Sequence, residues 1–166
     1  MLKKRNKTES MECHLVRGEI KSGHGVASGK GKDKRYPEGT LQIQFKYFLE
    51  RGLDLSNYFM GTINVDISPY SYKIKKPKYF FKNIDWSDYI PPENLYFFDV
   101  TLHYKDETYK GLVYMPDPET KEDHLQKPTV IELILPKING LKYGDMVDIS
   151  LKKDQLEMTP YFTKNI

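Results

Sequence analysis

The sequence predicts a mainly β protein, a small β-barrel that contains at most one or two short helices. Short apolar or alternating segments recur along the chain and are separated by frequent turn signals. Only a small part of the chain has apolar residues at helical spacing. Aromatic residues make up 13% of the sequence, with 13 Tyr and 8 Phe, and this composition favours strands.

The length of 166 residues fits one domain with a hydrophobic core. We expect a flexible basic tail over residues 1–12, a single β-barrel domain over 13–152 and a C-terminal tail over 153–166. Cys13 is the single cysteine, which excludes an intrachain disulfide and fits a reducing compartment. Apolar runs fall short of the roughly 20 residues of a membrane helix, and the N-terminal lysines precede no apolar signal segment. We therefore expect a cytoplasmic, monomeric protein without membrane contact.

The first half of the chain contains one ambiguous segment. Residues 14–20 are predicted to form a strand that runs into a glycine-rich loop at 22–32. Alternation over 41–45 fits a strand, whereas the apolar residues of 41–53 also fall at helical spacing and Gly52 stands where a helix would end. We favour a helix, whose apolar stripe would comprise Leu41, Phe45, Phe48 and Leu49.

The second half reads as a series of strands and turns. Residues 61–67 alternate between apolar and polar and end at Pro69. Residues 70–92 are expected to be a long ordered loop with short strands or one helical turn. A hairpin follows, with strands at 96–104 and 109–115 around a turn at 105–108. After a polar loop at 116–128, further strands are predicted at 129–135 and 146–151, the last preceded by a turn at 142–145.

The glycine-rich loop is a candidate phosphate site. Its glycines permit positive φ and close backbone approach, so that successive N–H groups can form a concave anion-binding surface. Serine hydroxyls and lysines add donors and charge to the same segment. The loop lacks the Gly-Lys-Ser/Thr ending of a Walker A motif and the βαβ context of a dinucleotide fingerprint. An ordinary surface loop is the alternative interpretation.

Three oxygen-bearing side chains are candidates for metal binding and catalysis. Thr62 and Asn64 lie two residues apart on a strand, and so on one face, and their uncharged oxygens suit magnesium. An exposed polar face is the alternative. Glu132 interrupts the apolar strand from Val130 to Leu135. It either points outwards or faces a polar cavity, where it would accept a hydrogen bond from a substrate hydroxyl or act as a base.

A cluster of lysines at 73–78 is interleaved with Tyr70, Tyr72 and Tyr79. Such mixing resembles a surface that binds single-stranded nucleic acid. It is also ordinary on β proteins, and we favour that interpretation, so that nucleic acid is not an expected partner. His24 and His124 have no cysteine or second histidine at metal-ligand spacing, which argues against zinc.

Taken in order, four of these segments resemble the archaeal CTP-dependent riboflavin kinase family. The family has a Gly-Glu-Val strand followed by Ser-Gly-x-Gly and a glycine-rich loop, a Gly-Thr-Leu-Asn motif, an Ile-Glu strand that ends in Pro, and a Gly-Asp-x-Val strand. The corresponding segments here are Gly18 to Gly25, Gly61 to Asn64, Ile131 to Pro136 and Gly144 to Val147. The resemblance covers roughly residues 14–151.

The resemblance implies a closed six-stranded cradle-loop β-barrel that uses CTP and Mg²⁺ to convert riboflavin to FMN. It implies that Thr62 and Asn64 bind magnesium, and that Glu132 and Thr120 face the flavin, with Glu132 as the catalytic residue. The nucleotide would lie against two segments, Gly23, His24, Gly25, Val26, Ala27 and Ser28, and Lys137, Ile138, Asn139 and Gly140. Ile138-Asn139 stands where the family has Leu-Arg. A barrel that binds nucleotide or flavin without catalysis is the alternative.

Overall fold

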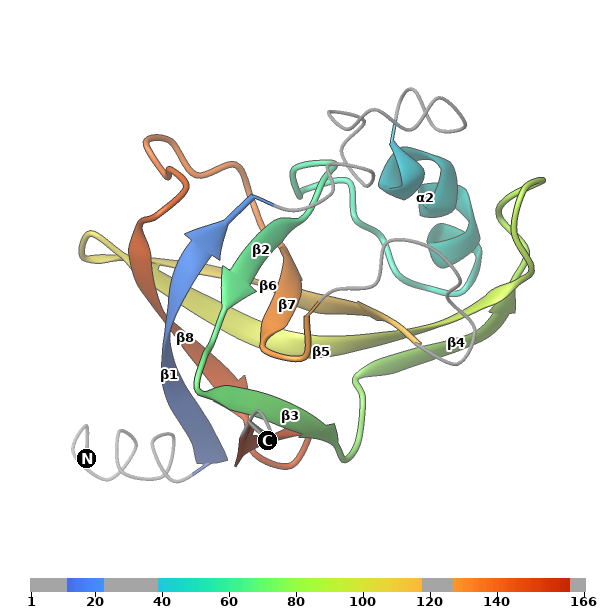
Figure 1. Ribbon diagram of the computed structural model, residues 1–166. Helices are drawn as coiled ribbons and strands as arrows, with labels where there is room; N and C mark the ends of the chain where they lie inside the picture. Colours follow the sequence, from blue (N-terminus) through green and yellow to red (C-terminus); the bar gives the residue numbers. More distant parts are fainter. Residues whose placement is uncertain (1–11, 23–38, 118–126, 162–166) are drawn as a thin grey trace, which may run out of the picture.

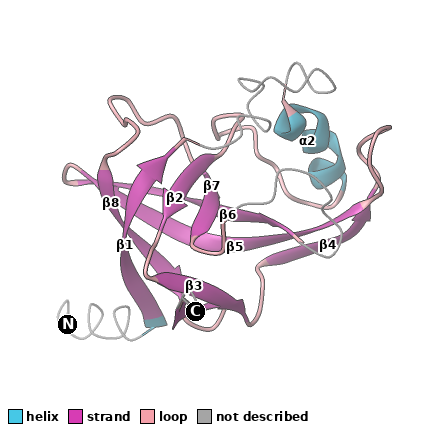
Figure 2. Cartoon of the chain, in the orientation of Figure 1, coloured by secondary structure: helices cyan, strands magenta, loops and turns pink. Residues whose placement is uncertain are grey.

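The computed structural model describes residues 12–22, 39–117 and 127–161 (Figure 1). These residues form one helix and a set of antiparallel strands, and Figure 2 shows the strands wrapping around one another with the helix to one side. The elements are β1 (Cys13–Lys21), α2 (Thr40–Glu50), β2 (Ile63–Asp66), β3 (Tyr70–Ile74), β4 (Tyr79–Ile84), β5 (Glu93–Tyr104), β6 (Glu107–Pro116), β7 (Val130–Ile134), β8 (Met146–Lys152) and β9 (Leu156–Pro160).

Six strands form a closed ring. Their order is β1, β2, β7, β6, β5 and β8, and β8 pairs again with β1. The ring closes through the β5–β8 pairing, in which Val100 lies opposite Leu151. Strand β4 adds to β5 outside the ring. The predicted mainly β fold with six strands in a closed arrangement is therefore confirmed, and α2 is the one helix in the described ranges.

The main hydrophobic core fills the interior of the ring. Alternate residues of each strand point inward because successive side chains of a strand face opposite sides. In β7, for example, Ile131 and Leu133 are buried inside the ring. The same core takes residues from every other strand of the ring, among them Val16, Ile20, Val65, Phe98, Val100, Val113, Val147 and Ile149.

A second core lies between the outer face of the ring and α2. Phe48 of the helix is fully buried and packs against Phe81 and Phe97, with ring centroids 5.8 and 5.1 Å away. Leu53 N–H bonds to the Phe48 carbonyl and Gly52 N–H to the Leu49 carbonyl, and Gly52 has a φ of 91°. This Schellman ending explains why glycine stands at position 52.

The helix predicted within 41–53 is confirmed, but its buried stripe differs from the predicted one. Gln44 is 1% exposed, whereas Leu49 is 49% exposed. The stripe therefore follows Thr40, Leu41, Gln44 and Phe48. Apolar spacing alone missed Gln44 because its buried amide has a side-chain partner on β6, described below.

Strands β3 and β9 form a small separate sheet that the sequence did not predict fully. Residues 70–92, expected as a long loop with short strands, contain β3 and β4, and the expected C-terminal tail contains β9. Tyr72 lies opposite Met158 and Ile74 opposite Leu156. These apolar side chains pack against the ring core, while the exposed charged residues between them, Lys73 and Glu157, obscured the alternation.

The β5–β6 hairpin is tighter than predicted. Tyr104 pairs with Glu107, so that only Lys105 and Asp106 form the loop. Both have positive φ, 48° and 63°, as a type I′ turn requires. Among the described residues, the one helix is too short to cross a bilayer.

Candidate functional site

Polar side chains lie side by side on three neighbouring strands of the ring. Asn64 of β2 is directly opposite Glu132 of β7, and Glu132 is directly opposite Tyr114 of β6. Paired residues of antiparallel strands point to the same face. The residues adjacent to Glu132 in β7, Ile131 and Leu133, point into the ring, so this polar row lies on the outer face.

Thr62 joins this row immediately before β2 begins. Its Oγ1 donates a hydrogen bond to Oε1 of Glu132 across 3.0 Å. Asn64 is 8% exposed, whereas Thr62 and Glu132 are half-buried. Thr62, Asn64 and Glu132 therefore present a hydroxyl, an amide and a carboxylate in one cluster, which we call the oxygen cluster.

The oxygen cluster resolves the two interpretations of Glu132. The residue points outwards from the ring, but it is held against Thr62 and lies between Asn64 and Tyr114. Hydroxyl, amide and carboxylate oxygens are the ligand types that Mg²⁺ uses, usually with only one or two protein ligands beside phosphates and water. A carboxylate in this position is also able to accept a proton from a hydroxyl.

A buried hydrogen bond ties α2 to the same face. The Tyr114 hydroxyl donates to Oε1 of Gln44 across 2.8 Å. Burial, and then the charges of Glu93 and Glu132, raise the pKa of Tyr114 well above its usual value of 10. The hydroxyl therefore stays protonated and remains a donor, which fixes the helix over β6 beside Glu132.

Gln44 and Tyr114 were missed in the sequence. A glutamine within an apolar helical stripe, and a tyrosine in a strand of apolar residues, were the available signals. Neither is distinctive without knowledge of the pairing, because each also fits an ordinary position at the edge of a core.

The glycine-rich segment begins beside Asn64. Lys21, the last residue of β1, is the cross-strand partner of Asn64. The predicted nucleotide-binding residues Gly23, His24, Gly25, Val26, Ala27 and Ser28 lie outside the described residues. The structure shows that the chain leaves the ring after Lys21, next to Asn64 of the oxygen cluster.

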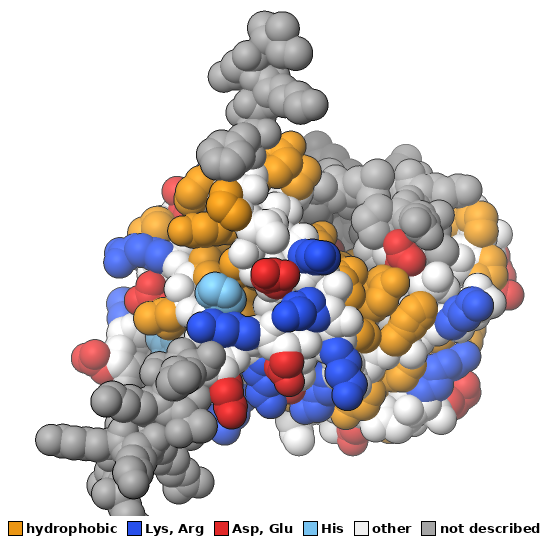
Figure 3. All heavy atoms as spheres, turned by 90° about the horizontal axis from the view of Figure 1, so that it is seen from below, with side chains coloured by type: hydrophobic (Ala, Val, Ile, Leu, Met, Phe, Trp, Pro, Cys, Tyr) orange, Lys and Arg blue, Asp and Glu red, His pale blue; other side chains and the backbone are white. Residues whose placement is uncertain are grey.

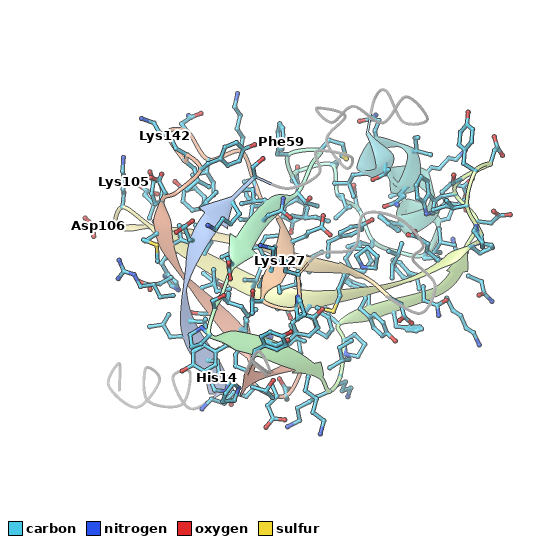
Figure 4. The ribbon with its side chains drawn as sticks, in the orientation of Figure 1. His14, Phe59, Lys105, Asp106, Lys127 and Lys142 are labelled. Atoms are coloured by element: carbon cyan, nitrogen blue, oxygen red, sulfur yellow. The ribbon has the colours of Figure 1, made fainter. Side chains whose placement is uncertain are left out.

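The second predicted nucleotide segment, Lys137 to Gly140, lies at the same end of the ring. The turn that follows it is tied to the end of β1, because Gly144 N–H bonds to the Ile20 carbonyl at 2.7 Å. The Tyr104 hydroxyl lies 3.2 Å from the carbonyl oxygen of Gly140. Phe59, labelled at this end in Figure 4, donates its N–H to the Leu135 carbonyl just before the segment.

Within this segment the side chains differ in exposure. Lys137, Asn139 and Gly140 are exposed, whereas Ile138 packs against the core of the ring. Lys137 is therefore the one cationic side chain that the segment offers to solvent. Thr120, the other residue expected at the flavin, lies outside the described residues.

Comparison with protein-family models and with curated proteins gives no match to this chain. Among the described residues, no group of three or more His, Cys, Asp and Glu side chains is placed to hold a metal ion. The geometry of the oxygen cluster and the position of its neighbours therefore carry the functional argument.

Proposed function

We propose that the protein is a CTP-dependent, riboflavin kinase-like phosphotransferase that makes FMN with magnesium. The observation that carries the proposal is the oxygen cluster, in which Thr62 bonds to Glu132 and Asn64 lies opposite it. The resemblance to the kinase family supplied the roles of these residues from linear motifs alone. Their convergence across two strands supports those roles, because Thr62 and Glu132 are 70 positions apart.

The proposed reaction transfers the γ-phosphoryl group of CTP to the 5′-hydroxyl of riboflavin. The hydroxyl oxygen bonds to the γ-phosphorus, the bond from that phosphorus to the β–γ bridging oxygen breaks, and CDP leaves. Glu132 orients the hydroxyl and accepts its proton. The protein contributes mainly positioning and charge stabilisation, as is usual in phosphoryl transfer.

Thr62 and Asn64 would hold the magnesium ion. The ion, when bound, supplies neutralisation of the β- and γ-phosphate charge. Gly23 to Ser28 would cradle the phosphates through backbone N–H groups, a role supported by the departure of that segment beside Asn64. Lys137, Ile138, Asn139 and Gly140 would contact the nucleotide base, and Thr120 the flavin. The enclosing fold would be a cradle-loop barrel.

Calorimetric titration with CTP, ATP and riboflavin in the presence of magnesium, together with chromatographic detection of FMN, tests this proposal. We expect binding of CTP and riboflavin and formation of FMN. Tight binding without FMN would select a non-catalytic barrel that holds nucleotide or flavin, an outcome favoured by Asn139 where the family has a cation. Failure to bind either ligand would remove both functions.

Variants separate the roles within the cluster. Thr62→Ala and Asn64→Ala are expected to reduce metal-dependent turnover more than riboflavin binding. Glu132→Gln is expected to reduce turnover by about 10²–10⁴-fold, the usual range for a positioned acid or base. Thr108→Ala and Glu107→Gln, exposed positions near the start of β6, serve as matched controls. Equal loss of turnover and riboflavin binding in Thr62→Ala would argue against a metal role.

A further inference from the structure

Exposed lysines gather on the side of the molecule that carries β3, which the proposed kinase reaction does not use. Figure 3 views this side and shows blue lysine and arginine side chains grouped over it, with carboxylates among them and hydrophobic side chains next to them. Lys73 of β3 and Lys75, Lys76 and Lys78 of the β3–β4 connection are all exposed.

Two segments that are distant in sequence build this cluster. The backbone N–H groups of Lys75 and Lys76 both bond to the carbonyl of Gln155, at 2.9 and 3.2 Å. This places the β3–β4 connection against the turn between β8 and β9, where Lys152 at the end of β8 and Lys153 in the turn are exposed. We call Lys73, Lys75, Lys76, Lys78, Lys152 and Lys153 together the lysine face.

The lysine face keeps a surplus of positive charge. Lys78 and Lys152 both pair with Asp99, at 2.9 and 3.4 Å. No ion pair is found for Lys73, Lys75, Lys76 or Lys153 in the part of the chain that the structure describes. Two carboxylates are near these four lysines: Asp154 follows Lys153 in the sequence, and Glu157 is the cross-strand partner of Lys73. Lysines therefore outnumber carboxylates on this face.

An exposed aromatic ring follows the lysine segment closely in the sequence. Phe80, two residues after Lys78, is 39% exposed and packs edge-to-face on Tyr96 with ring centroids 4.6 Å apart. Of the tyrosines singled out in the sequence, Tyr72 packs against the core of the ring and Tyr79 against the core beneath α2, whereas Tyr70 of β3 is 40% exposed. The exposed rings that remain available for stacking are therefore those of Phe80 and Tyr70.

We propose that the lysine face and Phe80 bind single-stranded nucleic acid. Lys73 and Lys75 are two residues apart along the chain, which corresponds to about 6.6 Å at 3.3 Å per residue of extended backbone. This spacing suits contacts to successive phosphates of a flexible nucleic-acid strand. A base then stacks on the exposed part of the Phe80 ring. The sequence alone favoured an ordinary solvated surface, and the convergence of two lysine segments in the folded chain changes that interpretation.

A linear polyanion fits this surface better than an anionic membrane does. The carboxylates of Asp99, Asp154 and Glu157 are interspersed among the lysines. A bilayer would cover the whole face and meet these carboxylates, whereas a single strand can follow the lysines and avoid them. The stacking contribution of Phe80 also requires bases rather than lipid headgroups.

Fluorescence anisotropy with a short labelled oligouridine tests the proposal. The chain is expected to bind at low salt and to weaken steeply as salt rises, with a log–log slope that contains roughly −0.7 for each phosphate contacted. The triple variant Lys73→Gln, Lys75→Gln and Lys76→Gln should bind about tenfold more weakly and reduce that slope by roughly 2. The matched control is Lys105→Gln, Lys110→Gln and Lys142→Gln, and it should leave both quantities nearly unchanged.

The control lysines belong to another part of the molecule. Figure 4 labels Lys105 and Lys142 at the end of the ring opposite β3. Phe80→Leu should weaken binding by about tenfold without changing the salt slope, since stacking is not ionic. Tyr143→Leu removes an exposed ring at the opposite end and should have no effect.

Three results would overturn the proposal. The first is no oligonucleotide binding at low salt, and the second is equal weakening by the two triple variants. The third is binding to phosphatidylserine-containing vesicles that depends on the same lysines when the oligonucleotide does not bind. FMN formation by the triple variant is expected to match that of the wild type, which keeps this test independent of the kinase proposal.

Discussion

Oγ1 of Thr62 donates a hydrogen bond to Oε1 of Glu132 across 3.0 Å and so joins the start of β2 to the middle of β7. A threonine hydroxyl has one donor and two acceptor lone pairs. Donation to Glu132 therefore leaves the oxygen lone pairs able to face a cation. The same contact holds the carboxylate in position, so the metal and acceptor roles that we propose share one hydrogen bond.

Thr62 variants should separate the hydroxyl from the rest of the side chain. Thr62→Val keeps the branched shape and removes the oxygen, and it is expected to raise the magnesium concentration needed for half-maximal turnover by about tenfold. Thr62→Ser keeps the hydroxyl and should stay near the wild type. Turnover measured against magnesium concentration gives the comparison. The metal role would be untenable if Val and Ser variants behaved alike.

Tyr114→Phe should destabilise the fold by about 1–3 kcal/mol, because it leaves the buried Gln44 amide oxygen without its donor. Urea denaturation measures the change in the free energy of unfolding. Tyr109→Phe, on the same strand, is the control and should stay within about 0.5 kcal/mol of the wild type. Replacing both partners, in Gln44→Leu with Tyr114→Phe, should recover part of the loss. A double variant no more stable than Tyr114→Phe would contradict this account.

Gly111→Ala should destabilise the junction of β6 and β7. A β-carbon at this position would collide with the backbone oxygen of Ile134, so the two strands would have to separate. Overpacking of this kind costs about 1–3 kcal/mol or more. Thermal unfolding measures the effect, and the exposed neighbour Lys110→Ala is the control. Unchanged stability of Gly111→Ala would contradict this prediction. It would show that β7, which carries Glu132 two residues before Ile134, can be displaced without loss of stability.

Asp99 should make stability fall at acid pH. Burial tends to raise its pKa, but hydrogen bonds from Lys78 and Gln155 and the charges of Lys78 and Lys152 outweigh burial and lower the pKa below 3.8. A lowered pKa means that the stabilisation is present above the unfolded value near 3.8 and is lost as pH falls through the folded-state pKa.

Asp99→Asn tests this pH dependence. It is expected to be less stable than the wild type by about 1 kcal/mol at pH 7, since it weakens charge-assisted hydrogen bonds on a partly exposed surface. The difference should shrink as the pH is lowered through the acid transition. Urea denaturation across pH 2–7 provides the measurement, with Asp106→Asn in the exposed β5–β6 turn as the control. If the difference in the free energy of unfolding between Asp99→Asn and the wild type stayed constant with pH, the lowered pKa of Asp99 would be refuted.

Local patterns were sufficient for most of the fold. Alternation predicted β2, apolar segments between turn signals predicted β1, β5, β6, β7 and β8, and Gly52 with helical spacing predicted α2. Strand β9 was missed because Leu156 and Met158, on either side of the charged Glu157, form too short an apolar pattern, and their burial depends on pairing with β3. Such pairing is a property of the folded chain and leaves little trace in either segment alone.

The candidate site was predicted unevenly for the same reason. Thr62 and Asn64 are two residues apart, and this spacing alone predicts that they lie on one face of a strand. The contact of Thr62 with Glu132 and the burial of Gln44 against Tyr114 depend on which strands are neighbours. The sequence suggested the chemistry of Glu132 but left its direction open, and the pairing of β7 with β2 and β6 determines it.

The most direct test of the central claim is FMN formation from riboflavin, CTP and magnesium, compared between the wild type and Glu132→Gln. The account predicts FMN from the wild type, a loss of about 10²–10⁴-fold in Glu132→Gln, and no loss in Glu107→Gln. Absence of FMN from the wild type under saturating ligands, or equal rates in Glu132→Gln and the wild type, would contradict it.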